Sequence, residues 1–104
     1  MTTPLTIDSG PRDDGSYVVA ADGEIDMSNV ATFTTAIETA VRASDGGTGV
    51  KVDLSSVDYL DSGAINTLFA HADHIRVVAN PILLPVLTVS GLTELVTVEA
   101  APSG

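Results

Sequence analysis

The sequence predicts a small α/β domain in which a mixed sheet of four or five strands packs against three or four helices. Short β-branched runs alternate with stretches whose apolar residues recur at helical spacing. The later runs are separated by single helices, which implies right-handed crossovers and parallel strands. With 104 residues and no linker-like stretch, we expect one domain over 1–104, with its core at about 5–98 and a flexible tail at 99–104.

The chain is predicted to begin with a hairpin. Residues 5–7 and 17–21 have the β-branched character of strands, and the turn formers at 8–15 predict the loop between them. Residues 23–26 are expected to leave the sheet.

A helix should follow this hairpin. Ser28 is a candidate N-cap, and the helix is expected to run to about position 43 before the glycine-rich turn at 44–49. Its apolar face is marked by Val30, Phe33, Ile37, Ala40 and Val41.

The stretch 50–65 carries the most information about function. It opens with strand alternation, continues as a loop and delivers Ser62 to the start of a second helix, expected at 62–73. The apolar face of that helix is marked by Ile65, Leu68, Phe69 and Ala72. A hydroxyl at the helix start is either an N-cap or a site where a phosphate can be added, and Asp61 is either a second cap or a contact for a basic group.

The last third continues the alternation of strands and helices. A strand is expected at 75–79 and a helix at 82–90, because Pro81 suits a first helical position. A helical turn at 92–95 and a short strand at 96–98 follow, and the chain should be loose from 100 onward.

The composition excludes several classes of function. Fourteen acidic residues against four basic ones give a net charge of -10, so binding to nucleic acid or to an anionic membrane works against Coulomb repulsion. The absence of cysteine excludes disulfides and thiolate metal sites, and His71 and His74 lack a third ligand, so we expect no metal and no cofactor. The longest apolar run is too short to span a bilayer and contains proline, which predicts a soluble, cytoplasmic protein.

Four stretches together resemble one known family, the STAS domain of bacterial anti-sigma factor antagonists, over roughly residues 5–98. They are the Gly-Glu-Ile-Asp of 23–26, the Val-Asp-Leu-Ser-x-Val-x-Tyr-Leu-Asp-Ser-Gly of 52–63, the Asn-Pro of 80–81 and the Leu-x-x-x-Gly-Leu of 87–92. The resemblance implies a STAS-like fold and a binding function without catalysis. Such antagonists bind an anti-sigma factor, often a serine kinase, and so free the sigma factor for transcription. The kinase phosphorylates a serine at the start of the second helix, and a phosphatase reverses this.

One position departs from the family pattern. The family usually has Asp-Ser-Ser-Gly-Leu or Asp-Ser-Thr-Gly-Leu, in which the second hydroxyl residue accepts the phosphate. Aligned without a gap, Gly63 occupies that acceptor position, and this alignment keeps Ile65 and Leu68 on the core face. Ser62 is then the fallback acceptor, and the loop alternatively docks without being phosphorylated.

We expect the partner to contact one end of the sheet. Both predicted strand-to-helix loops open there, which is where open α/β sheets usually bind their ligands. The expected contact residues are Asp26, Met27, Ser28, Asn29, Asp61, Ser62, Gly63 and Ala64. By similarity to the family, Asp53 lies at a strand end and anchors the loop. The alternative to a sigma-factor circuit is a STAS interaction module in a lipid or anion transporter complex.

Overall fold

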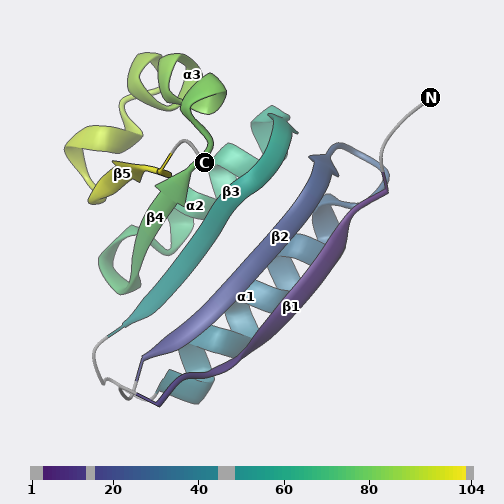
Figure 1. The fold of residues 1–104 in the computed structure, drawn as a ribbon, viewed down its shortest axis with the longest axis vertical. Helices are drawn as coiled ribbons and strands as arrows, with labels where there is room; N and C mark the ends of the chain where they lie inside the picture. Colours follow the sequence, from purple (N-terminus) through teal and green to yellow (C-terminus); the bar gives the residue numbers. More distant parts are fainter. Residues whose placement is uncertain (1–3, 14–15, 45–48, 103–104) are drawn as a thin grey trace.

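The centre of the structure is a five-stranded mixed sheet in the order β1-β2-β3-β4-β5 (Figure 1). This computed structural model describes residues 4–13, 16–44 and 49–102. The strands are β1 (Thr6–Pro11), β2 (Tyr17–Ile25), β3 (Val50–Leu60), β4 (Ile75–Ala79) and β5 (Val98–Ala100). β1 pairs with β2 in the antiparallel sense and all other pairs are parallel, which confirms the predicted mixed sheet.

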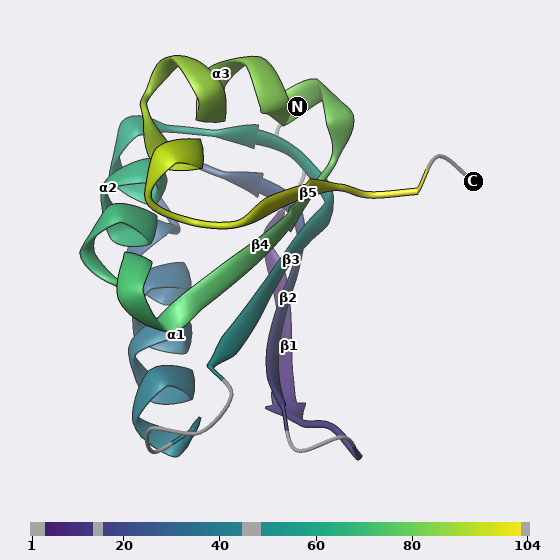
Figure 2. The same ribbon diagram turned by 90° about the vertical axis from the view of Figure 1, so that its left-hand side faces the viewer.

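The helices complete a two-layer arrangement. They are α1 (Val30–Ser44), α2 (Ser62–Ala70) and α3 (Leu84–Val89), with the 3₁₀ turns η1 (Ala72–His74), η2 (Pro81–Leu83) and η3 (Leu92–Glu94). In Figure 2, α1 and α2 cover one face of the sheet, and α3 lies across the end of the sheet at the top. None of the described helices is long and apolar enough to cross a membrane.

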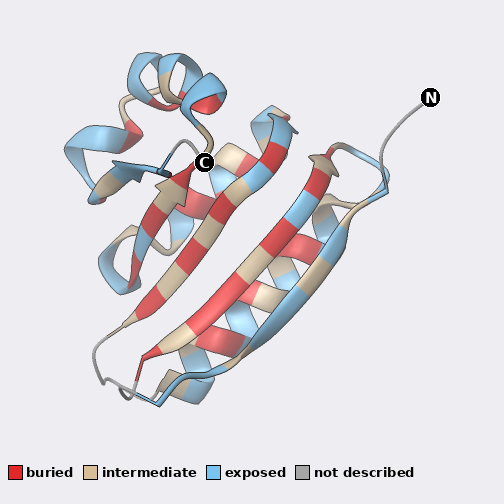
Figure 3. Ribbon diagram, in the orientation of Figure 1, coloured by how far each residue is buried: buried red, intermediate tan, exposed pale blue. Residues whose placement is uncertain are grey.

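The core lies between the sheet and the helices. Alternate residues of β2, β3 and β4 point toward the helices, and Figure 3 shows this alternation as bands of buried and less buried residues. α1 contributes Phe33, Ile37 and Ala40, as its spacing predicted, and α2 contributes Leu68. The core is therefore built almost entirely from Val, Leu, Ile and Ala, with Phe33 as its one fully buried aromatic among the described residues.

The first two strands are longer than predicted. β1 continues through 8–11, which were expected to belong to the hairpin loop, because its whole length pairs with β2. β2 continues through Ile25, so the prediction that 23–26 leave the sheet is wrong except for Asp26. Gly23 adopts a φ of 109° at a register shift between β2 and β3, a conformation that favours glycine and lets the strand continue past the irregularity.

The central strand is also longer than predicted, since 55–60 is strand and not loop. Asp53 therefore lies in the middle of β3 and not at its end. Its Oδ1 accepts hydrogen bonds from the Ser55 amide at 3.0 Å and the Ser55 hydroxyl at 2.6 Å. These bonds lie next to the shift in register between β2 and β3, so Asp53 stabilises a bulge within the strand.

The C-terminal segment is part of the sheet. The predicted strand at 96–98 is shifted to β5, and the Ala101 amide donates to the Ala79 carbonyl at 2.8 Å. Residues 99–101 are thus paired and not a flexible tail, and Ala101 is buried. The end of the predicted tail, 103–104, lies outside the described residues.

The parallel strands bring three connections to one end of the sheet, here called the carboxyl edge. β2 and β3 end there side by side, and β4 ends earlier, beside Leu54 of β3. The 26–29 turn, the start of α2 and η2 with α3 follow these three strands. In Figure 1 this edge is at the top. The topology therefore places segments from three parts of the sequence on one surface.

Candidate functional site

A shallow hollow opens at the carboxyl edge between the ends of β2 and β3. Its volume is about 510 Å³, and it is lined by Asp26, Met27, Ser28, Tyr59, Asp61 and Ser62. Five of these residues were predicted to contact a partner, and Tyr59 was not. The hollow combines two carboxylates with an apolar and an aromatic side chain, a combination that suits a basic group with an alkyl stem.

The 26–29 turn is held by its own side chains. Asp26 Oδ1 accepts from the Ser28 amide at 2.9 Å and from the Ser28 hydroxyl at 2.5 Å. Asn29 Oδ1 accepts from the Asp26 amide, and Asn29 Nδ2 donates to the Glu24 carbonyl, each at 2.9 Å. The hydroxyl of Ser28 is thus bonded to Asp26, and the prediction that Ser28 is the N-cap of α1 is wrong.

These bonds favour the ionised form of Asp26. The Ser28 hydroxyl, followed by the Ser28 amide, lowers the pKa of Asp26 below its ordinary value, and this outweighs the opposing effect of desolvation. The carboxylate is therefore charged at neutral pH and offers a fixed negative charge to a partner.

Asp61 is the N-cap of α2, one of the two roles that the sequence left open for it. Its backbone is extended, with φ of -88° and ψ of 177°, and its Oδ1 accepts from the Ala64 amide at 3.0 Å. Its own amide donates to the Ile25 carbonyl at 3.0 Å, which ties the start of α2 to the end of β2. Within the described residues, the second oxygens of Asp61 and Asp26 accept no hydrogen bond, so both can receive a donor from a partner.

Ser62 is the first residue of α2, exposed and beside the cap. Because Asp61 already binds the Ala64 amide, the capping role considered for Ser62 is taken by its neighbour. The Ser62 hydroxyl has no hydrogen-bond partner in the part of the chain that the structure describes. It is accessible to an enzyme that modifies hydroxyls, although the Ala64 amide at the helix start is already bonded to Asp61.

Gly63 lies where α2 approaches α1. A Cβ at this position would be 3.3 Å from Asp61 Oδ1 and 3.4 Å from Val30 Cγ2, distances that require the neighbours to shift slightly. The close approach of the two helix starts therefore favours a glycine at position 63.

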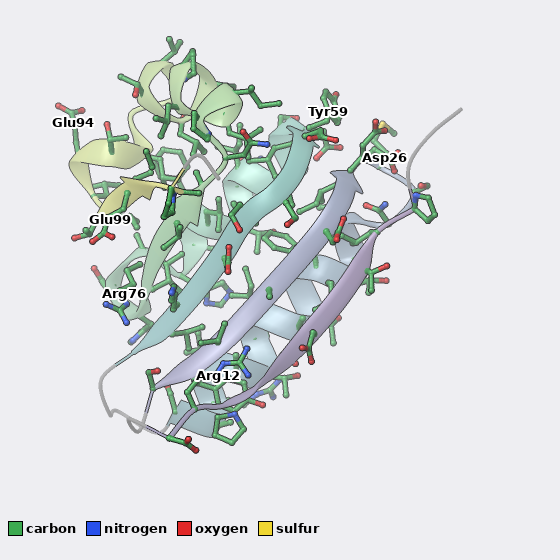
Figure 4. The ribbon with its side chains drawn as sticks, viewed as in Figure 1. Arg12, Asp26, Tyr59, Arg76, Glu94 and Glu99 are labelled. Carbon is green, nitrogen blue, oxygen red and sulfur yellow. The ribbon has the colours of Figure 1, made fainter. Side chains whose placement is uncertain are left out.

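Met27 and Tyr59 provide the apolar part of the hollow. Their exposed fractions are 87% and 50%, high values for side chains that stabilise a fold only when buried. Figure 4 shows Tyr59 and Asp26 near the ends of β3 and β2. Sequence reasoning missed Tyr59 because it placed 55–60 in a loop, but the pairing of Tyr59 with Glu24 fixes the ring at the edge.

The remaining predicted site residues differ in accessibility. Ala64 is fully buried and cannot touch a partner, so its inclusion in the contact surface is wrong. Asn29 is half-buried, and its side-chain amide is hydrogen-bonded to the backbone of Asp26 and Glu24. Among the described residues, no group of three or more His, Asp or Glu side chains is arranged to hold a metal ion.

Comparison with known proteins gives a family and a set of structures. A family model described as the Mlab, STAS domain matches residues 10–97. No curated protein matches the chain at a significant level.

The solved structures with similar folds include anti-sigma factor antagonists. One from Mycobacterium paratuberculosis has 27% identity and a TM-score of 0.81, with 92% of this chain and 86% of that chain covered. The antagonist SpoIIAA in its unphosphorylated form has 16% identity and a TM-score of 0.72, covering 94% and 90%. The phosphorylated form of SpoIIAA, from Bacillus, has 16% identity and a TM-score of 0.67, covering 94% and 93%. The two SpoIIAA structures are too distant in sequence to show more than the shared fold.

Proposed function

Because the chain belongs to the STAS domain family, we propose that it is an anti-sigma factor antagonist that regulates sigma-factor-dependent transcription by binding an anti-sigma factor in the cytoplasm. The observation that carries the proposal is the likeness to the mycobacterial antagonist, which extends over 92% of this chain. The acidic and apolar hollow at the carboxyl edge supplies a surface of the required kind.

The contact surface has a defined chemistry. Met27 and Tyr59 provide exposed apolar area, and the free oxygens of Asp26 and Asp61 accept hydrogen bonds from a basic side chain. Gly63 and Ser62 lie beside the hollow at the start of α2. A partner that places an arginine or lysine between the two carboxylates and its apolar surface on Tyr59 satisfies all of these groups.

The same geometry supports a switch by phosphorylation of Ser62. A phosphate there adds about -1.5 to -2 charges beside Asp61 and Asp26, at the mouth of the hollow. The added bulk and hydration obstruct the apolar contact, and acidic groups of the partner are repelled. Ser62 is the exposed hydroxyl closest to the family's usual acceptor position, which Gly63 occupies.

A purified system tests both proposals. The chain is captured with proteins from its own cell lysate, bound proteins are identified by mass spectrometry, and binding is remeasured with the purified partner. We expect an anti-sigma factor, with weaker binding of Ser62→Asp and unchanged binding of the control Ser62→Ala. If the partner is a kinase, incubation with ATP should place a phosphate on Ser62 and none on the Ser62→Ala protein.

A second candidate function remains because Gly63 leaves no hydroxyl at the usual acceptor position. In it, the chain is a STAS interaction module of a lipid or anion transporter complex that binds without being phosphorylated. Capture of an ATPase-type transporter subunit, with equal binding by Ser62→Asp and the unmodified chain, would favour this candidate and contradict the first.

A further inference from the structure

Six large hydrophobic side chains are exposed in the described structure. Two of them, Met27 and Tyr59, line the hollow. The other four are Ile82, Val86, Val89 and Leu95, with exposed fractions of 61%, 40%, 86% and 60%. Exposed apolar residues that lie together commonly mark interaction surfaces.

Three of these four form a stripe along one helical run. η2 and α3 are continuous from Pro81 to Val89, and Ile82, Val86 and Val89 follow one another at spacings of four and three, so they share a face. Leu83 and Leu87 face the core instead and are buried. The exposed side chains are therefore not needed to fill the core.

The segment of chain that carries the stripe is uncharged. No charged residue stands between Arg76 and Glu94, whereas the outer face of a surface helix normally carries charges. An outer face that is both apolar and uncharged is favoured when a partner covers it.

The stripe lies at the same edge as the hollow. η2 follows the carboxyl end of β4 and packs against β3, and the Asn80 amide donates to the Leu54 carbonyl at 3.2 Å. In both Figure 1 and Figure 2, α3 lies at the end of the sheet where β3 terminates. Met27 after β2, Tyr59 in β3 and the stripe after β4 thus belong to one edge, whereas Leu95 lies outside the helical run of the stripe, between η3 and β5.

We infer that the stripe of Ile82, Val86 and Val89 is the second half of the docking surface for the anti-sigma factor. This inference rests on the proposed function and adds the chemistry of the partner, which presents an apolar groove next to a basic side chain. The apolar stripe of α3 lies in this groove of the partner, and the partner's basic side chain binds Asp26 and Asp61. The six residues of the hollow are far fewer than the roughly 20–30 residues that each partner contributes to a stable interface, so the contact must extend beyond the hollow.

The test compares two lysine substitutions that add the same charge. Val89→Lys changes the stripe, and Leu95→Lys changes an exposed apolar residue outside the stripe, between η3 and β5. Affinities for the purified anti-sigma factor are measured by calorimetry, and thermal unfolding verifies that both variants are folded. Tyr59→Ala, in the hollow, is measured in parallel.

We expect Val89→Lys to weaken binding at least tenfold and Leu95→Lys to change it less than twofold. The decisive case is one in which the unmodified chain binds the anti-sigma factor and Tyr59→Ala weakens this binding, but Val89→Lys does not. The stripe is then not part of the interface and the inference is wrong, while the proposed function stands. Equal weakening by the two lysine variants would also overturn it, because the effect would then follow from net charge. If the unmodified chain binds no anti-sigma factor, the proposed function fails and this identification of the partner fails with it.

Discussion

At the residue scale, the site contains two carboxylates, and the fold uses one oxygen of each as a hydrogen-bond acceptor. Asp26 and Asp61 each employ Oδ1 to hold a turn or a helix start, and each leaves its second oxygen without a partner in the described residues. A side chain fixed in this way loses little conformational entropy when it binds a donor. Under the proposed function, each of these residues combines a structural role with a binding role, and a substitution of either carboxylate would affect both.

Replacing Ser28 by Ala should raise the pKa of Asp26 toward its ordinary value. The lost hydroxyl bond is the main cause of the lowered pKa, while the bond from the backbone amide at position 28 remains, so the rise should be partial. The pKa is measured by following the Asp26 carboxyl carbon in an NMR pH titration.

The sign of the effect on stability follows from the direction of this shift. Since the folded pKa lies below the unfolded one, the hydrogen bonds to Asp26 contribute stability above the unfolded pKa, and this is lost as pH falls through the folded pKa. Ser62→Ala is the control, because that hydroxyl makes no bond to Asp26. An unchanged Asp26 titration in the Ser28→Ala protein would show that the hydroxyl does not hold the carboxylate.

At the scale of the elements, the start of α2 is held against α1. The Thr34 and Thr67 hydroxyls are 2.7 Å apart, and Thr67 Oγ1 also donates to the Gly63 carbonyl at 3.1 Å. Thr67 is buried, and the close approach of Gly63 to Val30 lies one turn away. Packing between the helices therefore determines where Ser62 and Asp61 are presented.

Val substitutions at Thr34 and Thr67 should interact in a double-mutant cycle. Thr34→Val removes the bond between the two hydroxyls, and Thr67→Val removes both that bond and the bond to the Gly63 carbonyl. Each single change should cost about 1 kcal/mol of unfolding free energy or more, and the double change should cost less than the sum, because the bond between the hydroxyls is lost only once. Urea denaturation measures the three variants. Thr35→Val, an exposed position of the same helix, should have little effect, and additive losses at 34 and 67 would show that the two hydroxyls are not coupled.

At the scale of the whole molecule, the two ends of the chain form the two edges of the sheet. β1 protects β2 and β5 protects β4, so the strands that carry the carboxyl edge are all internal. Charge is also distributed along the molecule. Lys51 and Arg76 lie opposite each other near the starts of β3 and β4, while Asp26 and Asp61 lie beyond the ends of β2 and β3. Figure 4 shows Arg76 and Asp26 at opposite ends of the sheet. This polarity favours approach of a basic partner to the carboxyl edge.

Deleting residues 98–104 should lower the free energy of unfolding by about 1–3 kcal/mol, because β4 loses hydrogen bonds to β5 and the Ala101 contact. The exposed strand edge should also promote aggregation. Urea denaturation and light scattering measure the two effects, and deletion of 103–104 alone is the control. Equal stability of both truncated chains would contradict a structural role for β5.

Much of the fold was predictable because it depends on local periodicity. The stripe of α1, the strand at 75–79 and the helix start at Ser62 were recognised from spacing, and their order implied parallel strands with their loops at one edge. Five of the six residues of the hollow followed from that reasoning.

Strand lengths and the division of roles at the site depended on contacts between distant residues. β3 reaches Leu60 because β2 continues beside it to Ile25, and that pairing fixes Tyr59 at the edge. β5 forms because the edge of β4 is open to it, although the sequence predicted a strand only as far as Val98 and a tail beyond it. Likewise Asp61 caps α2 and leaves Ser62 free because its amide is anchored to β2. Periodicity and capping depend on residues that are close in the sequence, so they can be predicted from it. Backbone hydrogen bonds between strands join residues that are distant in the sequence, so their partners are decided only when the chain folds.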